Sequence, residues 1–240
     1  MTSPSEHENL EGFPSLSNTI TVTSPRLYTD RNVQHLCSEN NKIYGLLARG
    51  GVPSKLNTAT LDIGNLKGKY GENAIGSLFN ILALEHPDLY VFHSVAAPAN
   101  KPGETDHIIL YRNKLILIET KTYSNFRVFK INKQGELRGR KMGERNTLRV
   151  LDNNNLIEKV ARYESIFPEY NVHAVTAITR SNVETTSENG KYKVASLTNI
   201  LQNLEYHMNQ AVPVSQDLNT ESILYLASNC LNSDYVKYES

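Results

Sequence analysis

The feature that most constrains the fold is a pair of short apolar runs joined by a polar dipeptide. The runs cover residues 105–111 and 114–121, with Arg-Asn at 112–113 between them. Both runs are short and lack helical periodicity, so the pattern predicts a β-hairpin. A loop of two or four residues places Asp106 opposite Glu119, whereas a three-residue loop would put these carboxylates on opposite faces. We expect the even loop.

In this register Asp106, Glu119 and Lys121 share one face of the hairpin, because side chains alternate along a strand. Like charges on directly opposed residues destabilise a sheet, and a divalent cation with oxygen ligands would relieve the repulsion. A simpler alternative stays open. Glu119 and Lys121 could form an ordinary ion pair, and Asp106 could simply begin a strand.

The order of these residues resembles the active-site core of the PD-(D/E)XK nuclease superfamily. More closely, it resembles the nuclease-related NERD domain in three elements. These elements are Thr105-Asp106-His107, Ile118-Glu119-Thr120-Lys121 and the upstream Gly71-Glu72.

The chain departs from the NERD pattern at two places. The family tends to carry Asn-Pro-x-x-Gln at the start of a later helix, and the best-matching positions here are Asn154, Asn155 and Glu158. An acidic residue therefore stands where the family has an amide, and Lys159 or Arg162 could contact phosphate instead. The family's glycine after Glu-x-Lys is replaced by Ser124-Asn125.

The resemblance implies an α/β fold with a restriction-endonuclease-like core, in the order αβββαβ, with a mixed central sheet flanked by helices and with N- and C-terminal helical extensions. It also implies that Asp106 and Glu119 bind Mg²⁺ or Mn²⁺, that Glu72 supports the metal, and that Lys121 positions or activates a water. The expected activity is metal-dependent phosphodiester hydrolysis, with DNA favoured over RNA. The alternative is a catalytically inactive module that binds nucleic acid or protein and retains the fold.

A basic stretch follows the hairpin and predicts a contact with the phosphate backbone of nucleic acid. It has eight basic residues against two acidic ones, Glu136 and Glu144. The eight predicted nucleic-acid-binding residues are Arg127, Lys130, Lys133, Arg138, Arg140, Lys141, Arg145 and Arg149.

The remaining sequence divides the chain into four parts. We predict a disordered arm over 1–30, a helical lead-in over 31–69, the nuclease-like domain over 70–212 and a helical extension over 213–240. The lead-in contains a predicted helix from Asp30 to Gly50. Within the later parts we expect a helix from Gly71, a strand over 89–95, a helix over 155–167, a strand over 172–179, a polar loop over 180–190, a short strand over 192–195 and helices over 197–209 and 220–230.

The composition indicates a globular protein whose basic surface must be local. The chain has 240 residues, of which 39% are hydrophobic, and a formal net charge of zero. Its two cysteines, Cys37 and Cys230, fit neither a disulfide framework nor a thiolate zinc site. No secretory signal or membrane-spanning run is visible, and we expect a cytoplasmic protein without a membrane partner. The oligomeric state is left open.

Overall fold

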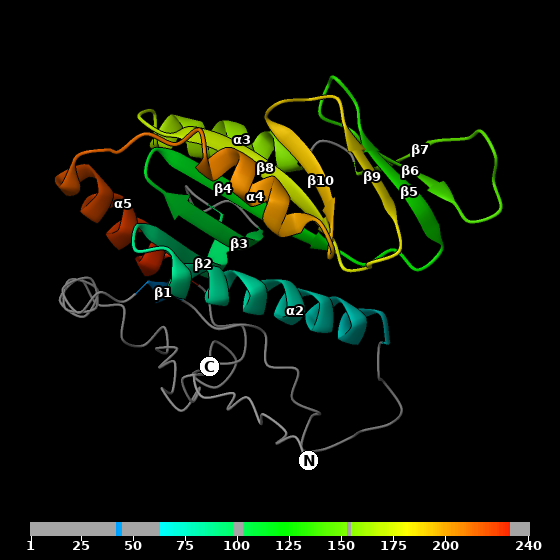
Figure 1. The fold of residues 1–240 in the computed structure, drawn as a ribbon, viewed down its shortest axis with the longest axis horizontal. Coiled ribbons are helices and arrows are strands. Elements are labelled where there is room, and N and C mark those ends of the chain that lie inside the picture. The colour runs from blue at the N-terminus through cyan, green and yellow to red at the C-terminus, as the bar shows by residue number, and fades with distance from the viewer. Residues whose placement is uncertain (1–41, 45–62, 98–102, 153–154, 231–240) are drawn as a thin grey trace, which may run out of the picture.

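A computed structural model describes residues 42–44, 63–97, 103–152 and 155–230 of the chain (Figure 1). Ten strands form two sheets in this part of the chain. The central sheet has six strands in the order β1-β2-β3-β4-β8-β10, and a second sheet has four strands in the order β7-β6-β5-β9. The predicted α/β class is confirmed, and the architecture is consistent with a restriction-endonuclease-like core.

The predicted αβββαβ order is present, with strands of the second sheet inserted between its third strand and its second helix. Antiparallel β2, β3 and β4 form a meander, and β8 pairs in parallel with β4, which makes the sheet mixed. The framework elements are α2 (Ile63–Glu85), β2 (Leu89–Ala96), β3 (Glu104–Tyr111), β4 (Lys114–Lys121), α3 (Asn155–Ile166) and β8 (Asn171–Ile178).

The second sheet is built mainly from the basic stretch between β4 and α3. Its strands are β5 (Phe126–Ile131), β6 (Leu137–Lys141), β7 (Arg149–Asp152) and β9 (Glu184–Ser187), and β9 pairs in parallel with β5. The predicted polar loop over 180–190 is therefore wrong at β9. Its four residues are all polar, so the strand has no apolar alternation to predict it and depends on pairing with β5.

Four further elements complete the described fold. They are β1 (Ile43–Tyr44), β10 (Tyr192–Ser196), α4 (Ile200–Met208) and α5 (Gln216–Ser228). β1 pairs in parallel with β2 at one edge of the central sheet, and β10 pairs in parallel with β8 at the other. The predicted strand over 192–195 and the two late helices are confirmed, with shifted ends.

Helices cover both faces of the central sheet, and each face has its own core (Figure 1). On one face α2 and α4 pack over residues such as Ile109, Ile116 and Ile118. On the other face α3 and α5 pack over residues such as Leu115 and Leu117. Because successive strand residues alternate between these two cores, the face of every β4 side chain is fixed.

The predicted helix over Asp30–Gly50 is wrong where the structure describes it, at Ile43 and Tyr44. Ile43 packs in the α2 and α4 core and Tyr44 packs in the α3 and α5 core, so consecutive side chains point to opposite faces, as in a strand. The backbone pairing with β2 overrides the weak local helical pattern. The other residues of this predicted helix and the predicted arm over 1–30 lie outside the described residues.

Helix α2 begins at Ile63 rather than at Gly71, where we predicted its start. Gly71 is needed for close packing, not for a turn. A Cβ atom at this position would lie 2.3 Å from Cγ2 of Thr179 and 3.2 Å from Oγ1 of Thr122. The bare backbone therefore lets α2 approach the ends of β4 and β8, where the candidate site lies.

Candidate active site

The hairpin has the predicted even register. Tyr111 pairs with Lys114, and the ladder continues without a shift to the pair His107 and Ile118. Asp106 and Glu119 are the next residues in this register, directly beyond the last paired residues. The main-chain N–H of Thr120 donates a hydrogen bond to Oδ2 of Asp106 at 2.6 Å, so a side-chain carboxylate continues the pairing there.

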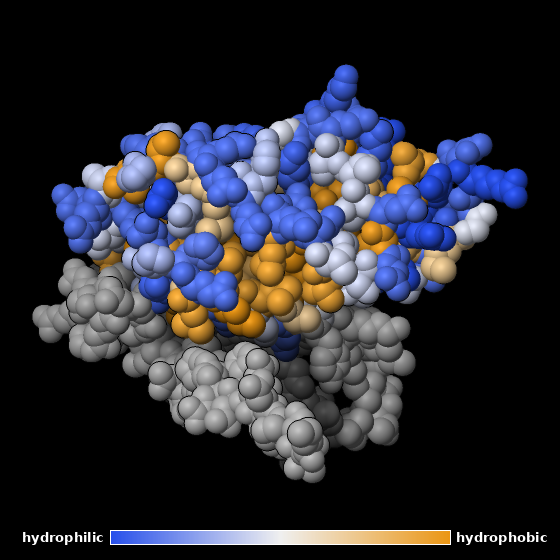
Figure 2. Space-filling view, in the orientation of Figure 1, coloured by the Kyte–Doolittle hydropathy of each residue, from blue (hydrophilic) through white to orange (hydrophobic). Residues whose placement is uncertain are grey.

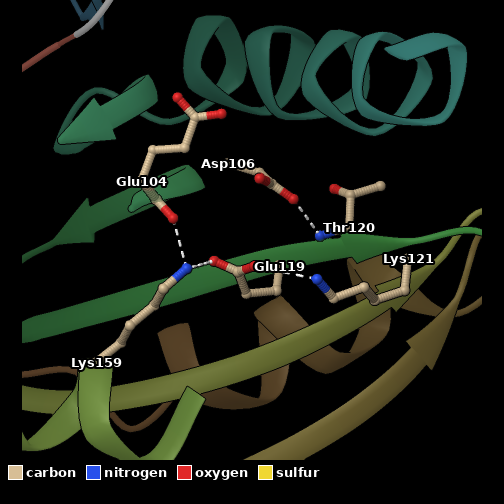
Figure 3. Close-up of polar contacts among 6 residues, drawn as sticks. All are labelled: Glu104, Asp106, Glu119, Thr120, Lys121 and Lys159. Carbon is tan, nitrogen blue, oxygen red and sulfur yellow. Dashed lines mark hydrogen bonds and ion pairs between the residues drawn. The ribbon is translucent and has the colours of Figure 1, made fainter. Parts of the chain in front are cut away.

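Asp106 and Glu119 belong to the α3 side of the sheet. Residues two apart on a strand share a face of the sheet. Asp106 is therefore on the same face as Ile108 and Leu110, and Glu119 is on the same face as Leu117. These three apolar residues pack in the core under α3 and α5. Nζ of Lys121 lies 3.5 Å from Oε2 of Glu119 on this side. Figure 3 shows the Asp106 and Glu119 carboxylates at the ends of their adjacent strands.

The backbone next to Asp106 is irregular. The β2–β3 ladder pairs His93 with His107 and Val95 with Thr105, and it skips the residues between them, Ser94 and Asp106. Ser94 has a φ of 50°, in the left-handed region that serine rarely adopts. Such strained residues concentrate at functional sites, which favours a role for this end of the sheet beyond packing.

Lys159 of α3 contributes a buried cation that sequence reasoning did not place at the site. Its ammonium group ion-pairs with Oε1 of Glu119 and donates a hydrogen bond to the main-chain carbonyl of Glu104 (Figure 3). Both side chains of the pair are only 8% exposed. Glu119 is thus bracketed by two lysines, with Lys159 at one carboxylate oxygen and Lys121 at the other.

Glu158, which best matched the family's amide, points away from the site. It is exposed and ion-pairs with Arg162 at 3.4 Å. Helical spacing explains why the neighbouring residue reaches Glu119 instead. Lys159 lies three residues after Leu156 and four before Tyr163, both buried, so it falls in the same stripe of α3. This helical spacing could have identified Lys159 as a buried residue from the sequence.

The electrostatics of Asp106 show that negative charge is concentrated at this site. Burial is the largest cause that raises the pKa of Asp106 to about 8, and the nearby charges of Glu119 and Glu72 raise it as well. The Thr120 N–H and the Lys121 ammonium act in the opposite direction but do not cancel the effect. Asp106 therefore holds a proton at neutral pH in the metal-free protein.

Glu72 acts on the site through its charge, which raises the pKa of Asp106. It lies half-buried on α2, directly after the closely packed Gly71. Within the described ranges, no three His, Cys, Asp or Glu side chains gather tightly enough to hold a metal ion. The arrangement fits Mg²⁺ or Mn²⁺ on the condition that waters or substrate oxygens complete the shell. Mg²⁺ is commonly held in this way, by one or two carboxylates and substrate phosphates.

His107 does not face the carboxylates. It is buried beneath α2, where its ring meets the edge of Phe79, and its Nδ1 lies 2.9 Å from Nδ1 of His93. His93 in turn contacts Oδ1 of Asn80 on α2 at 2.8 Å. These contacts pack His107 against the helix layer. They tie α2 to the meander from which Asp106 extends.

The predicted nucleic-acid-binding residues all lie in or next to the projecting second sheet, whose visible surface is largely hydrophilic (Figure 2). Half of them are close to carboxylates. The pairs are Arg127–Glu184 at 4.0 Å, Lys130–Glu188 at 2.5 Å, Arg138–Glu136 at 2.9 Å and Arg149–Glu144 at 2.5 Å.

The other half have no carboxylate partner among the described residues. Arg140 donates to the main-chain carbonyl of Arg145 at 2.8 Å, Lys141 lies over the ring of Phe126, and Lys133 and Arg145 are exposed. Arg140 and Lys141 are the last two residues of β6, and Arg145 lies in the turn between β6 and β7. Positive charge that is not locally neutralised is therefore concentrated at that turn.

None of the helices in the described ranges is long and apolar enough to cross a membrane. This finding concerns only the part of the chain whose structure is described.

Comparison with known proteins identifies one family. The family model for the nuclease-related domain, NERD, matches residues 67–179, from within α2 to the residue after β8. No curated protein and no solved structure matches the chain. The match covers Glu72, Asp106, Glu119, Lys121 and Lys159, and a NERD domain is consistent with the PD-(D/E)XK superfamily. Residues 67–179 of this chain are therefore a nuclease-related domain of the NERD family.

Proposed function

We propose that this protein is a metal-dependent nuclease that hydrolyses phosphodiester bonds, with DNA favoured over RNA. The observation that carries the proposal is the pair of carboxylates at the end of one hairpin, half-buried Asp106 and buried Glu119, with Lys121 beside Glu119. The raised pKa of Asp106 adds support, because it marks a site where a bound cation would be favourable.

In this proposal Asp106 and Glu119 would hold Mg²⁺ or Mn²⁺, and Glu72 would support the charge of the site from α2. The bound ion would supply Lewis-acid polarisation of the scissile phosphate and charge stabilisation of the leaving oxygen. Binding requires Asp106 to release its proton, so ionisation of Asp106 is part of assembling the site.

Lys121 would act on the attacking side. Its side chain is one-third exposed, at 33%, so its ammonium group can reach a water or a phosphate oxygen while it remains close to Glu119. As a donor without an acceptor, it cannot ligate a cation. Its role is to orient the water and assist its deprotonation.

Lys159 would regulate access to the metal ligand. In the metal-free protein its ammonium group occupies one oxygen of Glu119, and a cation that uses this oxygen must displace it or share the carboxylate with it.

The turn between β6 and β7, with Arg140, Lys141 and Arg145, would hold the phosphate backbone. The chain has two cysteines, too few for a disulfide framework, which fits a reducing compartment. We therefore propose that the protein is cytoplasmic.

The contact between Lys159 and Glu119 also favours a second candidate. If Lys159 serves as the permanent counter-ion of Glu119, the domain would be a catalytically inactive module that binds nucleic acid or protein.

One experiment separates the two functions. Supercoiled plasmid and single-stranded DNA are incubated with wild type, Glu119→Gln and Lys121→Ala, in Mg²⁺, in Mn²⁺ and in EDTA, and Mg²⁺ is titrated into each protein by calorimetry. The nuclease predicts cleavage only by wild type with metal, and metal binding that survives in Lys121→Ala. Cleavage that persists in Glu119→Gln, or equal metal affinity in all three proteins, would rule out this mechanism.

A further inference from the structure

Four basic side chains gather at the end of the central sheet that lies away from Asp106 and Glu119. They are Lys114 at the start of β4, His173 on β8, Lys193 on β10 and His207 on α4, and we name them the basic cluster. The three strands are adjacent in the sheet, in the order β4-β8-β10. Each of the three strand residues lies two positions before a residue of the core under α2 and α4, so all three face the α4 side of the sheet. These core residues are Ile116, Val175 and Ala195.

The side chains of the basic cluster are close together and largely buried. Nζ of Lys114 lies 3.5 Å from Nε2 of His173, and the rings of His173 and His207 have centroids 4.3 Å apart. Lys114 is 5% exposed and His207 is 1% exposed. The ammonium group of Lys193 lies 5.6 Å from the ring centroid of Tyr206.

The proton positions leave unused donors inside the cluster. Burial is the main cause that lowers the pKa of His173 to about 3 and that of His207 to about 4, so both rings are neutral at neutral pH. An ammonium group can only donate, so Nε2 of His173 accepts from Lys114, and the proton of this ring must be on Nδ1. This Nδ1 is buried and has no hydrogen-bond partner, and neither has either ring nitrogen of His207.

No carboxylate balances this group among the described residues. The charged groups that act on His173 and His207 are Lys114, Lys193 and, for His173 alone, Lys191, and all are cations. Lys191 already pairs with Glu164, whereas neither lysine of the cluster has an ion-pair partner in the described ranges. Buried donors without acceptors and buried like charges are both unfavourable, and one bound anion would relieve both.

We propose that the basic cluster binds a phosphate-type dianion, either free phosphate or the terminal phosphate of a nucleotide. Its several acceptor oxygens match the two ammonium groups and the imidazole N–H donors of the cluster. A zinc ion fits poorly, because two imidazoles fall short of four ligands and two lysines repel a cation. Glu119 lies five residues further along β4, roughly 17 Å away at 3.3 Å per residue, so the anion site is separate from the proposed nuclease site.

The test is calorimetric titration of inorganic phosphate into the full chain, with the histidine ring signals followed by NMR. Phosphate is expected to bind wild type and to shift the signals of His173 and His207. Lys193→Met and His207→Gln should each weaken binding roughly tenfold or more, since each removes a donor to a charged group. Lys193 is half-exposed, so its variant should fold even if His207→Gln does not. Arg112→Gln, which neutralises a cation at the hairpin tip that already pairs with Asp88, is the matched control and should bind as wild type does.

Two further titrations identify the source of the phosphate. A deoxynucleoside 5′-monophosphate that binds more tightly than inorganic phosphate indicates a nucleotide ligand, and equal affinity indicates free phosphate. Ring signals that stay unmoved by phosphate, equal weakening in Arg112→Gln, or a response of the two rings to Zn²⁺ in place of phosphate would each overturn the proposal.

Discussion

The ammonium group of Lys159 ion-pairs with Oε1 of Glu119, the carboxylate for which the sequence predicts a metal-binding role. The two residues lie on different elements, α3 and β4, and both side chains are nearly buried. This contact changes what is expected from substitutions at the two carboxylates. Repulsion between Asp106 and Glu119 alone would make removal of either charge stabilising, but Lys159 makes the two positions unequal.

Glu119→Gln should destabilise the metal-free protein, by on the order of 3 kcal/mol, because it leaves the Lys159 cation buried without a counter-charge. Asp106→Asn should stabilise the metal-free protein at neutral pH, because wild type must bind a proton at Asp106 on folding and asparagine avoids that cost. Asp106 is already protonated at neutral pH, and an asparagine oxygen can still accept from the Thr120 N–H. Urea unfolding of both variants without metal measures this difference. Equal stability of the two variants would contradict the structural role given to the Lys159 contact.

Lys159→Met should raise the affinity for Mg²⁺ by at least about tenfold, because it removes a cation that competes for the Glu119 carboxylate. The measurement is calorimetric titration of Mg²⁺ in EDTA-free buffer. Arg162→Gln, which neutralises an exposed cation three residues further along α3, should leave the affinity unchanged. A fall in affinity in Lys159→Met would mean that Lys159 holds Glu119 in place for the metal rather than competing with it.

The free energy of unfolding should depend on pH through the titration of Asp106. Its pKa rises from 3.8 to about 8 on folding, so the native state binds the proton more tightly than the unfolded chain does. The stability that this group contributes is complete below 3.8 and is lost as the pH rises through about 8. Subtracting the unfolding free energies of Asp106→Asn from those of wild type across this range isolates the effect. A flat difference would contradict the raised pKa, and Mg²⁺ affinity should increase over the same interval.

The turn between β6 and β7 should contribute more to nucleic-acid binding than the paired residues of the same sheet. The double variant Lys141→Met, Arg145→Gln should lower the salt dependence of DNA binding by roughly one unit of slope for each lost contact. The matched control is Lys130→Gln, Arg149→Gln, which neutralises two cations that already pair with Glu188 and Glu144. Equal losses in both double variants would place the binding surface over the whole sheet.

Two glycines of α2 should respond in opposite directions to alanine. Gly71→Ala should destabilise the protein by about 1–3 kcal/mol, because its Cβ would overlap Cγ2 of Thr179. Gly68→Ala in the same helix meets nothing within 4 Å and should stabilise it by about 0.5–1 kcal/mol. Thermal melts measure both. If Gly71→Ala melts as wild type does, α2 is not held against β4 and β8 as closely as described.

The hairpin register could be predicted from the sequence because it depends on two local properties, strand alternation and an even loop. These fixed the placement of Asp106 beside Glu119 and of Lys121 on the same side. The buried positions of α3, including Leu156, Val160 and Tyr163, followed equally from helical spacing. The sequence is sufficient to predict structure where the spacing of apolar residues and the length of a turn determine it.

Other features depend on contacts between distant residues, and the sequence could not supply them. Lys159 reaches Glu119 only because α3 crosses that particular strand end, and helical spacing alone does not identify the strand. The sequences of β1 and β9 have no apolar pattern that predicts a strand. β1 forms by pairing with β2, and β9 forms by pairing with β5. The ion pairs that neutralise half of the basic stretch include partners on β9 that lie far along the chain, such as Glu184.

The parallel pairing of β4 with β8 has a consequence for how the chain folds during synthesis. β4 is buried along almost its whole length, and one of its two neighbours, β8, is translated only after β5, β6, β7 and α3. Until residue 178 has left the ribosome, the Leu and Ile residues of β4 form an unprotected strand edge, which is a template for aggregation. A C-terminally truncated fragment should therefore become soluble only when it includes β8, and a chaperone that binds the nascent chain would be most useful over this interval.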